Sequence, residues 1–98
     1  MASTKEYRYY TLEQLSLINN VSCRSMMGEF LLYADGVLFG GIYDDRLLVK
    51  IVRGFNDEFG MSEAIPYEGG KVMYLVEDVD DREKLAEIVE KTCEGLKA

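Results

Sequence analysis

The sequence has no histidine, and its two cysteines, Cys23 and Cys93, lie far apart in the chain. The lack of histidine excludes His-based catalytic triads, histidine general bases and histidine metal ligands. The spacing of the cysteines excludes a CxxC motif, and in a cytoplasmic protein we expect both to be free thiols. The alternative, a disulfide, requires the strand near residue 23 to lie beside the last helix. We therefore expect a non-enzymatic protein with no catalytic residue, no metal site and no cofactor.

Long apolar runs are also absent. No stretch approaches the ~18 residues of a membrane-spanning helix. The first residues, MASTKEYRYY, lack the apolar core of a signal peptide. We therefore expect a cytoplasmic protein that makes no contact with a membrane.

Basic residues are few as well: 11 Lys and Arg stand against 18 Asp and Glu, which gives a net charge of −7. The basic residues are scattered along the chain and form no cluster. Neutralisation of phosphates by Lys and Arg supplies most of the affinity of proteins for nucleic acid. We therefore expect no direct contact with DNA or RNA.

The 98-residue chain, 48% apolar and 30% charged, has the composition of a single soluble domain. A chain of this length buries enough surface to form a core without disulfides or metals. No linker, repeat or low-complexity stretch divides it. We expect one domain over residues 1–98.

Two turn signals organise the middle of the chain. Asp35-Gly36 and Asp44-Asp45 separate apolar runs, and an Asp-Gly pair in this context favours a hairpin because glycine accepts a positive φ. Gly28 favours either a bulge or a sharp bend. Together the signals predict an antiparallel meander, with strands at 22–27 or 29–34, at 37–43 and at 46–51.

A glycine pair, Gly40-Gly41, lies inside the expected strand at 37–43. Glycine weakens strands, so a pair within one indicates a bulge or the close approach of another backbone. A helix crossing the strand and a bound ligand both fit this pattern. We favour the helix.

Capping patterns predict helices near both ends of the chain. Ser3 with Glu6, and Asp80 with Glu83, form capping boxes, and Gly95 is a C-cap candidate. The helices are expected at about 4–19 and 81–95. Between them we expect a short helix or turn at 52–60, a loop at 61–71 and an interior strand at 71–77.

This order predicts an α+β fold of two layers, in which helices cover one face of an antiparallel sheet. Most of the expected strands are apolar on both faces, as Phe30 with Leu31 illustrates. An apolar face that helices leave open usually marks an interaction surface. We expect a homodimer partner or another protein to bury it. The alternative is that loops at 52–70 fold over it.

Six residues are candidates for that interaction surface. Arg24 and Glu29 are interpreted as a surface pair that a partner recognises. The structural reading, which we favour, has Met26 or Met27 filling the core and a bend at the following glycine. Aromatic residues crowd the middle of the chain and are enriched at interfaces, although they also suit a core. The candidates are Arg24, Glu29, Tyr33, Phe39, Tyr43 and Tyr74.

Three stretches carry a family resemblance. They are YYTLEQLS (residues 9–16), RSMMGEFLLYADGVLFGGIYDDRLLVK (24–50) and IPYEGGKVMYLVEDVDDREKLAEIV (65–89). Together they resemble the TfoX/Sxy N-terminal domain family over essentially the whole chain. The resemblance implies a secretion-chaperone-like α+β fold in the order α-β(3)-α-β(2)-α, and it supplies no catalytic residues.

The resemblance also implies a role. Named members of this bacterial family regulate competence for DNA uptake with the cyclic-AMP receptor protein, and they carry a second, helical domain that has no counterpart in these residues. We therefore expect a regulatory domain that acts through protein contacts in transcriptional regulation. Its partner is expected to be the transcription machinery, a cyclic-AMP receptor-type regulator or a second copy of the chain. The alternative is a chaperone-like or ligand-binding module that uses the open sheet face.

Overall fold

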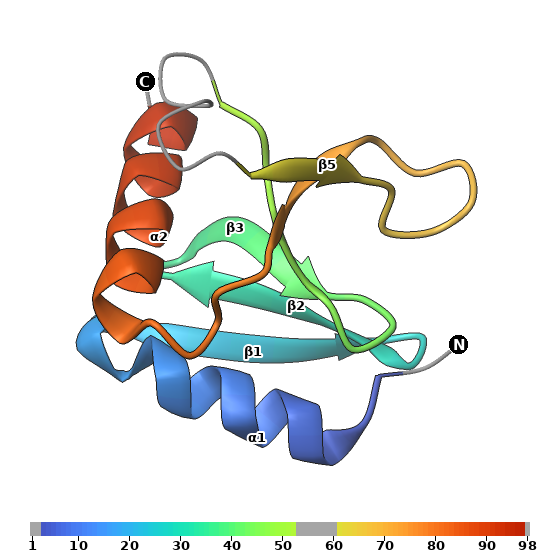
Figure 1. Cartoon of the computed structure of the whole chain (residues 1–98), viewed down its shortest axis with the longest axis horizontal. Coiled ribbons are helices and arrows are strands. Elements are labelled where there is room, and N and C mark those ends of the chain that lie inside the picture. Colours follow the sequence, from blue (N-terminus) through green and yellow to red (C-terminus); the bar gives the residue numbers. More distant parts are fainter. Residues whose placement is uncertain (1–2, 53–60, 98) are drawn as a thin grey trace.

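A computed structural model describes residues 3–52 and 61–97 of the chain. These residues form a six-stranded antiparallel sheet in the order β1-β2-β3-β4-β6-β5, with two α-helices and a short 3-10 helix, η1 (Figure 1). The elements are α1 (Lys5–Gln14), η1 (Leu15–Leu17), β1 (Val21–Met26), β2 (Glu29–Ala34), β3 (Val37–Ile42), β4 (Leu47–Val49), β5 (Ser62–Ala64), β6 (Met73–Val76) and α2 (Arg82–Lys97). The expected α+β class is confirmed, and β6 is the expected interior strand. The short helix expected at 52–60 falls on residues 53–60, outside the described part.

Three two-residue turns connect the first four strands. Met27-Gly28, Asp35-Gly36 and Asp44-Asp45 have positive φ at both residues, between 50° and 87°. Positive φ at both positions is the signature of type I′ turns, whose twist matches that of paired strands. The meander is therefore confirmed. It has four strands rather than three, because 22–27 and 29–34 are separate strands with a sharp bend between them.

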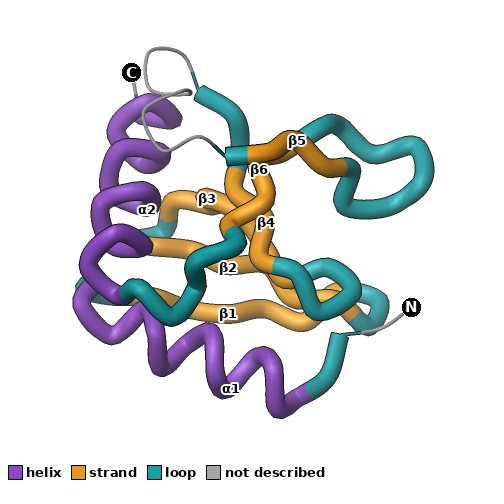
Figure 2. The backbone as a smooth tube through the Cα atoms, in the orientation of Figure 1, coloured by secondary structure: helices purple, strands orange, loops and turns teal. Residues whose placement is uncertain are grey.

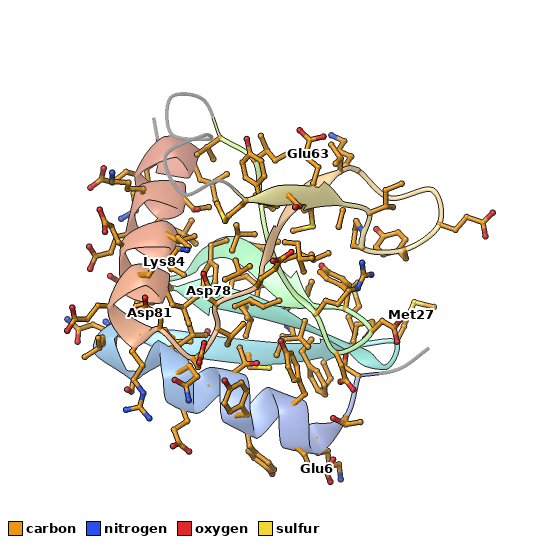
Figure 3. All side chains as sticks on the ribbon, viewed as in Figure 1. Glu6, Met27, Glu63, Asp78, Asp81 and Lys84 are labelled. Carbon is orange, nitrogen blue, oxygen red and sulfur yellow. The ribbon has the colours of Figure 1, made fainter. Side chains whose placement is uncertain are left out.

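The first turn corrects the expectation that Met26 or Met27 fills the core. Met27 is 97% exposed at the tip of the β1–β2 hairpin, and Met26 is 39% exposed. Figure 3 shows Met27 projecting away from the body of the molecule. The left-handed backbone at Met27, with φ of 51°, is unfavourable for a residue that has a Cβ atom.

The start of α1 differs from the expected capping box. Thr4 caps the helix, because its hydroxyl accepts a hydrogen bond from the Tyr7 N–H at 3.1 Å. Ser3 instead donates from its backbone N–H and its hydroxyl to the Glu29 carboxylate, at 3.1 and 2.7 Å. The helix also ends before the expected residue 19, since the chain tightens into η1 after Gln14.

Helix α2 begins and ends later than expected. Asp81 rather than Asp80 caps it, by accepting a hydrogen bond from the Lys84 N–H at 3.1 Å. Gly95 lies inside the helix and does not end it. A Cβ atom at Gly95 would lie 2.6 Å from the Val52 side chain, so the glycine allows α2 to pack closely against the segment that follows β4.

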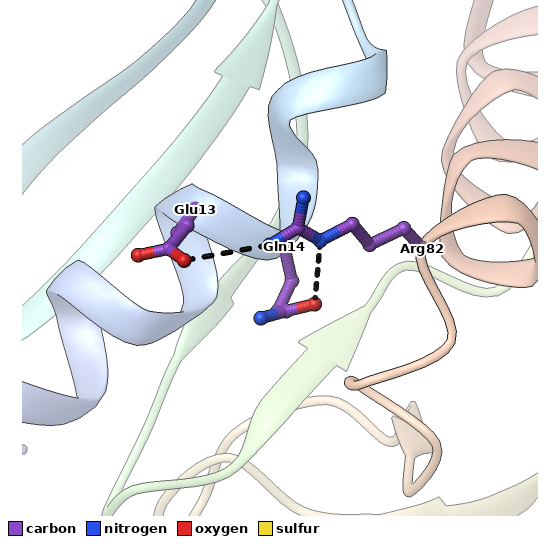
Figure 4. Close-up of polar contacts among 3 residues, drawn as sticks. All are labelled: Glu13, Gln14 and Arg82. Carbon is purple, nitrogen blue, oxygen red and sulfur yellow. Dashed lines mark hydrogen bonds and ion pairs between the residues drawn. The ribbon is translucent and has the colours of Figure 1, made fainter.

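A polar contact ties the start of α2 to the end of α1 (Figure 4). Arg82 donates from Nε to Gln14 Oε1 at 3.1 Å, and its Nη2 atom lies 3.4 Å from Glu13 Oε1. Gln14 is buried, so this hydrogen bond satisfies an amide oxygen that has lost contact with water. The hydrogen bond therefore joins the start of α2 to the end of α1.

Both helices pack on the same face of the sheet. The main core joins side chains of α1, η1 and α2 to alternate residues of the strands, among them Leu32 and Phe39. Figure 2 shows α1 and α2 in purple at the border of the strands in orange. The expected one-sided helix layer is confirmed, and Leu48 and Leu75 belong to a separate cluster on the opposite face.

The glycine pair in β3 marks both features that such a pair indicates. The register between β2 and β3 shifts at Leu32 and Tyr33, which is a bulge beside Gly40. A Cβ atom on Gly40 would overlap the carbonyl oxygen of Leu48 in β4. The backbone that approaches Gly40 is therefore that of a neighbouring strand, whereas the sequence favoured a crossing helix.

Candidate functional site

The sheet face opposite the helices is apolar but only partly open. Tyr43, Leu48 and Met73 form a second, smaller buried cluster on this face. The ring of Tyr67 covers Tyr43, with the ring centroids 6.1 Å apart and the planes tilted by 52°. A loop therefore covers one end of the face. This agrees in part with the alternative prediction, that loops at 52–70 fold over it.

The segment of residues 65–72, called the 65–72 loop below, is held in place by Arg46. The Nη2 atom of Arg46 donates to the carbonyl oxygens of Ile65 and Pro66, at 3.2 and 3.3 Å. Its Nε atom donates to the carbonyl oxygen of Tyr43 at 3.2 Å. One guanidinium thus connects the turn between β3 and β4 to the loop.

A cleft of about 500 Å³ opens between the 65–72 loop, strand β3 and the residues that follow β4. Tyr43 and Tyr67 supply the aromatic part of its lining, and Ile51 and Val72 add aliphatic surface. These residues come from both ends of a long stretch of chain. The fold, rather than any local motif, therefore creates the cleft.

Two lysines, Lys50 and Lys71, are the charged residues among the described residues that line the cleft. No described acidic side chain lines it, although the chain has 18 acids and 11 bases. The backbone of Lys50 is fixed, because its N–H donates to the Phe39 carbonyl oxygen at 2.9 Å. The cleft thus combines apolar walls with local positive charge on an acidic protein.

The Tyr43 hydroxyl is neutral at physiological pH. Burial raises the pKa of Tyr43 above its ordinary value, and Tyr67, Glu29 and Tyr33 raise it further. A protonated phenol is a hydrogen-bond donor as well as an acceptor. Tyr43 can therefore donate a hydrogen bond while its ring contributes apolar surface.

Exposed apolar side chains gather at this cleft. Of the nine large apolar side chains that are exposed in residues 3–52 and 61–97, four lie at the cleft or on the loop beside it. We call these four, Ile51, Ile65, Tyr67 and Val72, the cleft patch; their exposed fractions run from 38% to 56%. Single exposed apolar residues are ordinary, whereas a cluster marks an interaction site.

The predicted surface residues do not gather at the cleft. Phe39 and Tyr74 are 0% and 6% exposed in the main core beneath the helices, which corrects their placement on the open face. The error has a physical cause: these strands are apolar on both faces, so alternation could not tell one face from the other. Tyr43, by contrast, lines the cleft.

Arg24 and Tyr33 lie on the face opposite the helices but outside the cleft lining. Arg24 pairs with Leu31 across the β1–β2 ladder, and directly paired residues share a face. Tyr33 follows Leu31 by two residues on the same strand, so it shares that face too. These positions extend the face towards the exposed edge strand β1.

Glu29 has a structural role and does not form the expected surface pair. Its carboxylate accepts hydrogen bonds from Ser3, as described above, and from the Asp44 N–H at 3.2 Å to each oxygen. Asp45 completes the arrangement by accepting a hydrogen bond from the Thr4 N–H at 2.8 Å. These contacts, called the N-terminal clasp below, fasten the start of α1 to the turn between β3 and β4.

Sequence reasoning missed Lys50 and Lys71 as site residues, and it counted Tyr67 only among the aromatic residues of the middle of the chain. The cleft forms only when a loop folds onto strands that are distant in the sequence, and no periodicity reports such a contact. One local signal was present: Pro66 and Gly69-Gly70 flank Tyr67, and such residues favour a turn. The structure has that turn, with the Gly70 N–H donating to the Tyr67 carbonyl oxygen at 2.9 Å.

The acidic stretch before α2 makes contacts within the protein. The Lys84 ammonium donates to Asp78 Oδ2 at 2.8 Å, and this hydrogen bond raises the pKa of Lys84 (Figure 3). Across the described residues, no group of three or more Cys, Asp or Glu is arranged to hold a metal ion.

None of the helices in the described part of the chain is long and apolar enough to cross a membrane. Cys23 and Cys93 are free thiols, as expected.

Comparisons with known proteins give one positive result. A search of curated proteins found no match. The family model of the TfoX N-terminal domain matches residues 13–96, from within α1 to within α2, so the match includes the whole sheet and the residues that line the cleft. Because this match spans most of the chain, the protein belongs to the TfoX N-terminal domain family.

Proposed function

We propose that this chain is a non-enzymatic regulatory domain that acts through protein contacts, with the cleft patch as its contact surface. The observation that carries the proposal is the gathering of exposed apolar side chains around one cleft. Burial of such surface by a partner contributes roughly 25 cal/mol per Å² of apolar area. A partner therefore gains affinity from residues that contribute little to the stability of the free protein.

Family membership supports the regulatory part of the proposal. Named members of the TfoX/Sxy family regulate competence for DNA uptake together with the cyclic-AMP receptor protein. The proposed partner of this chain is accordingly the transcription machinery or a regulator of the cyclic-AMP receptor type. A net charge of −7 favours contact with such a protein over contact with the DNA backbone.

A matched pair of tyrosines tests the proposal. Tyr67 and Tyr9 are 56% and 61% exposed, and Tyr9 lies on α1, where its ring contacts the Arg8 guanidinium. Each variant, Tyr67→Glu and Tyr9→Glu, replaces the native gene in the source organism, and transcript levels are compared with those of a deletion strain. We expect Tyr67→Glu to reproduce the transcript changes of the deletion and Tyr9→Glu to resemble the wild type. Circular dichroism checks that both variants fold.

Two results would contradict the proposal. If the deletion leaves transcript levels unchanged, the domain has no regulatory role under those conditions. If the deletion changes them but Tyr67→Glu does not, the contact surface lies elsewhere. Light scattering of the same proteins shows whether the cleft patch contacts a second copy, because self-association through it would be lost in Tyr67→Glu alone.

The cleft itself supports a second candidate, a module that binds a small molecule. Its volume of about 500 Å³ falls in the range of ~300–1,000 Å³ that is common for such sites. Thermal shift against a metabolite panel tests this candidate, because a ligand that binds only the folded state raises the melting temperature. A hit that stabilises the wild type and Tyr9→Glu but not Tyr67→Glu would favour it.

A further inference from the structure

We propose that the segment bound at this cleft is an acidic peptide with apolar side chains. Its carboxylates face Lys50 and Lys71, and an apolar side chain enters beside Tyr43 and Tyr67. This inference rests on the proposed function, since it names the chemistry of the partner at the same surface.

The distribution of charge carries the inference. The chain has seven more acids than bases (18 − 11), yet the described lining of the cleft contains two lysines and no acid. A protein with this net charge attracts basic partners at long range. Local complementarity at the cleft favours an acidic segment instead, and complementary charge sets specificity and register. The two tendencies predict opposite partners, which makes the inference testable.

The apolar part of the cleft argues for a peptide rather than a nucleic acid. A single-stranded nucleic acid needs a basic groove that follows its backbone, in addition to aromatic rings that stack on its bases. Here the cleft patch extends beyond the two lysines to Ile65, which lines a neighbouring pocket together with Glu29, Asp44 and Glu68. Aliphatic side chains of a peptide are suited to such a surface.

The cleft is preformed, which lowers the conformational entropy lost on binding. Arg46 fixes the start of the 65–72 loop, and the Tyr67 ring already lies against Tyr43. A Cβ atom at Gly70 would lie 3.1 Å from Pro66 and 3.1 Å from the Tyr67 ring, so the loop is also packed tightly within itself. The peptide therefore meets an ordered surface.

Peptide selection tests the inference even while the partner is unidentified. A display library of random short peptides is selected on the folded wild-type protein and counter-selected on the double variant Lys50→Glu/Lys71→Glu. We expect the retained peptides to be enriched in Asp and Glu next to Leu, Ile or Phe. Retained peptides that are basic or uncharged would overturn the inference, as would a failure to retain any peptide.

Affinity measurements on one selected peptide complete the test. We expect charge reversal at Lys50 and Lys71 to weaken binding at least tenfold, and added salt to weaken binding to the wild type. The matched control is Lys5→Glu/Lys97→Glu, two exposed lysines that do not line the cleft, and it should bind as the wild type does. Equal loss in both double variants would overturn the inference, because the effect would then follow net charge alone.

The outcome is separable from that of the proposed function. If Tyr67→Glu alters transcript levels but acidic peptides are not retained, the contact surface stands and its partner has another chemistry. If acidic peptides bind but Tyr67→Glu leaves transcript levels unchanged, the peptide inference holds and the regulatory role fails. A single-stranded oligonucleotide that binds more tightly than the selected peptide would also overturn the inference.

Discussion

The guanidinium of Arg46 holds the carbonyl oxygen of Pro66, with 3.3 Å between Nη2 and the oxygen. Pro66 is buried and precedes the aromatic ring that forms one wall of the cleft. The position of Tyr67 therefore depends on a side chain from the distant turn between β3 and β4. Asp44 and Asp45, just before Arg46, take part in the N-terminal clasp. The turn between β3 and β4 therefore contacts both the start of α1 and the 65–72 loop.

Removal of the Arg46 guanidinium should loosen the 65–72 loop. Arg46→Met keeps the apolar stem but loses the donors to Ile65 and Pro66, and hydrogen bonds from charged donors contribute roughly 1.5–3 kcal/mol. We expect a free energy of unfolding lower by about that amount, and faster tryptic cleavage after Lys71. Urea denaturation and timed proteolysis measure the two effects. Arg24→Met, at an exposed position on β1, is the control and should shift stability by at most ~0.5 kcal/mol.

Loss of the Glu29 carboxylate should release the N-terminal clasp. Glu29→Ala removes the acceptor of the Asp44 N–H and of the Ser3 hydroxyl, while the Ser3 N–H keeps the Gly28 carbonyl oxygen at 3.1 Å. We expect the free energy of unfolding to fall by roughly 0.5–1.5 kcal/mol. Glu63→Ala, at an exposed acid on β5, is the matched control and should be nearly neutral. Equal stability of the two variants in urea would show that the clasp contributes nothing. Hydrogen exchange at the start of α1 provides a local readout of the same change.

The turn at Met27-Gly28 offers a stabilising substitution. Asparagine is preferred at the first position of a type I′ turn, and it tolerates left-handed backbone better than methionine does. Since Met27 is 97% exposed, its replacement removes no packing. We expect Met27→Asn to raise the free energy of unfolding by about 1 kcal/mol, measured by urea denaturation. A destabilised variant would mean that Met27 makes a stabilising contact in solution.

The two thiols should react slowly in the folded protein. Burial raises the pKa of both Cys23 and Cys93 above the ordinary thiol value, so less thiolate is present near neutral pH. We expect iodoacetamide to modify both more slowly than in urea-unfolded protein, and Cys93, the more buried, more slowly than Cys23. Mass spectrometry of timed reactions between about pH 7 and 9 measures the rates. Equal rates in folded and unfolded protein would contradict the effect of burial.

The same shifts give a sign for the dependence of stability on pH. A raised pKa in the folded state means that the folded chain binds protons more tightly than the unfolded chain does. The resulting stabilisation is complete below the unfolded thiol pKa of about 8.5, and it is lost as pH rises through the higher folded value. Stability should therefore decline on the alkaline side, and Cys93→Ala should decline less than the wild type.

The sequence predicted those parts of the fold that local chemistry determines. Asp35-Gly36 predicted its hairpin correctly, because glycine is the residue that most often takes a positive φ. Met27-Gly28 did not distinguish a hairpin turn from a bulge, because methionine rarely takes that conformation. Capping boxes were placed one residue away from the true caps. At the N-terminus the reason is physical: Glu29, distant in the sequence, draws Ser3 into the clasp, and Thr4 caps the helix instead.

The candidate site was less predictable because it depends on which face of each strand is buried. Both faces of β2 and β6 carry apolar side chains. The sequence pattern therefore could not show that Tyr74 lies in the main core while Met73 lies in the smaller cluster on the opposite face. The cleft needs Arg46, Tyr43 and the 65–72 loop together, and their proximity is a property of the folded chain. Of the six predicted surface residues, Tyr43 is the one that lines the cleft.

Strand order divides the sheet into a part made of consecutive strands and a part that a long connection joins to it. Strands β1 to β4 are neighbours both in sequence and in space, so two-residue turns bring them together at little cost in loop entropy. Strand β6 instead pairs with β4 across a much longer stretch of chain, and long loops of this kind close slowly. We expect strands β1 to β4 to pair first. Strand β6, with its hairpin partner β5, then pairs with β4. The cleft, which needs both parts, is then among the last features of the molecule to form.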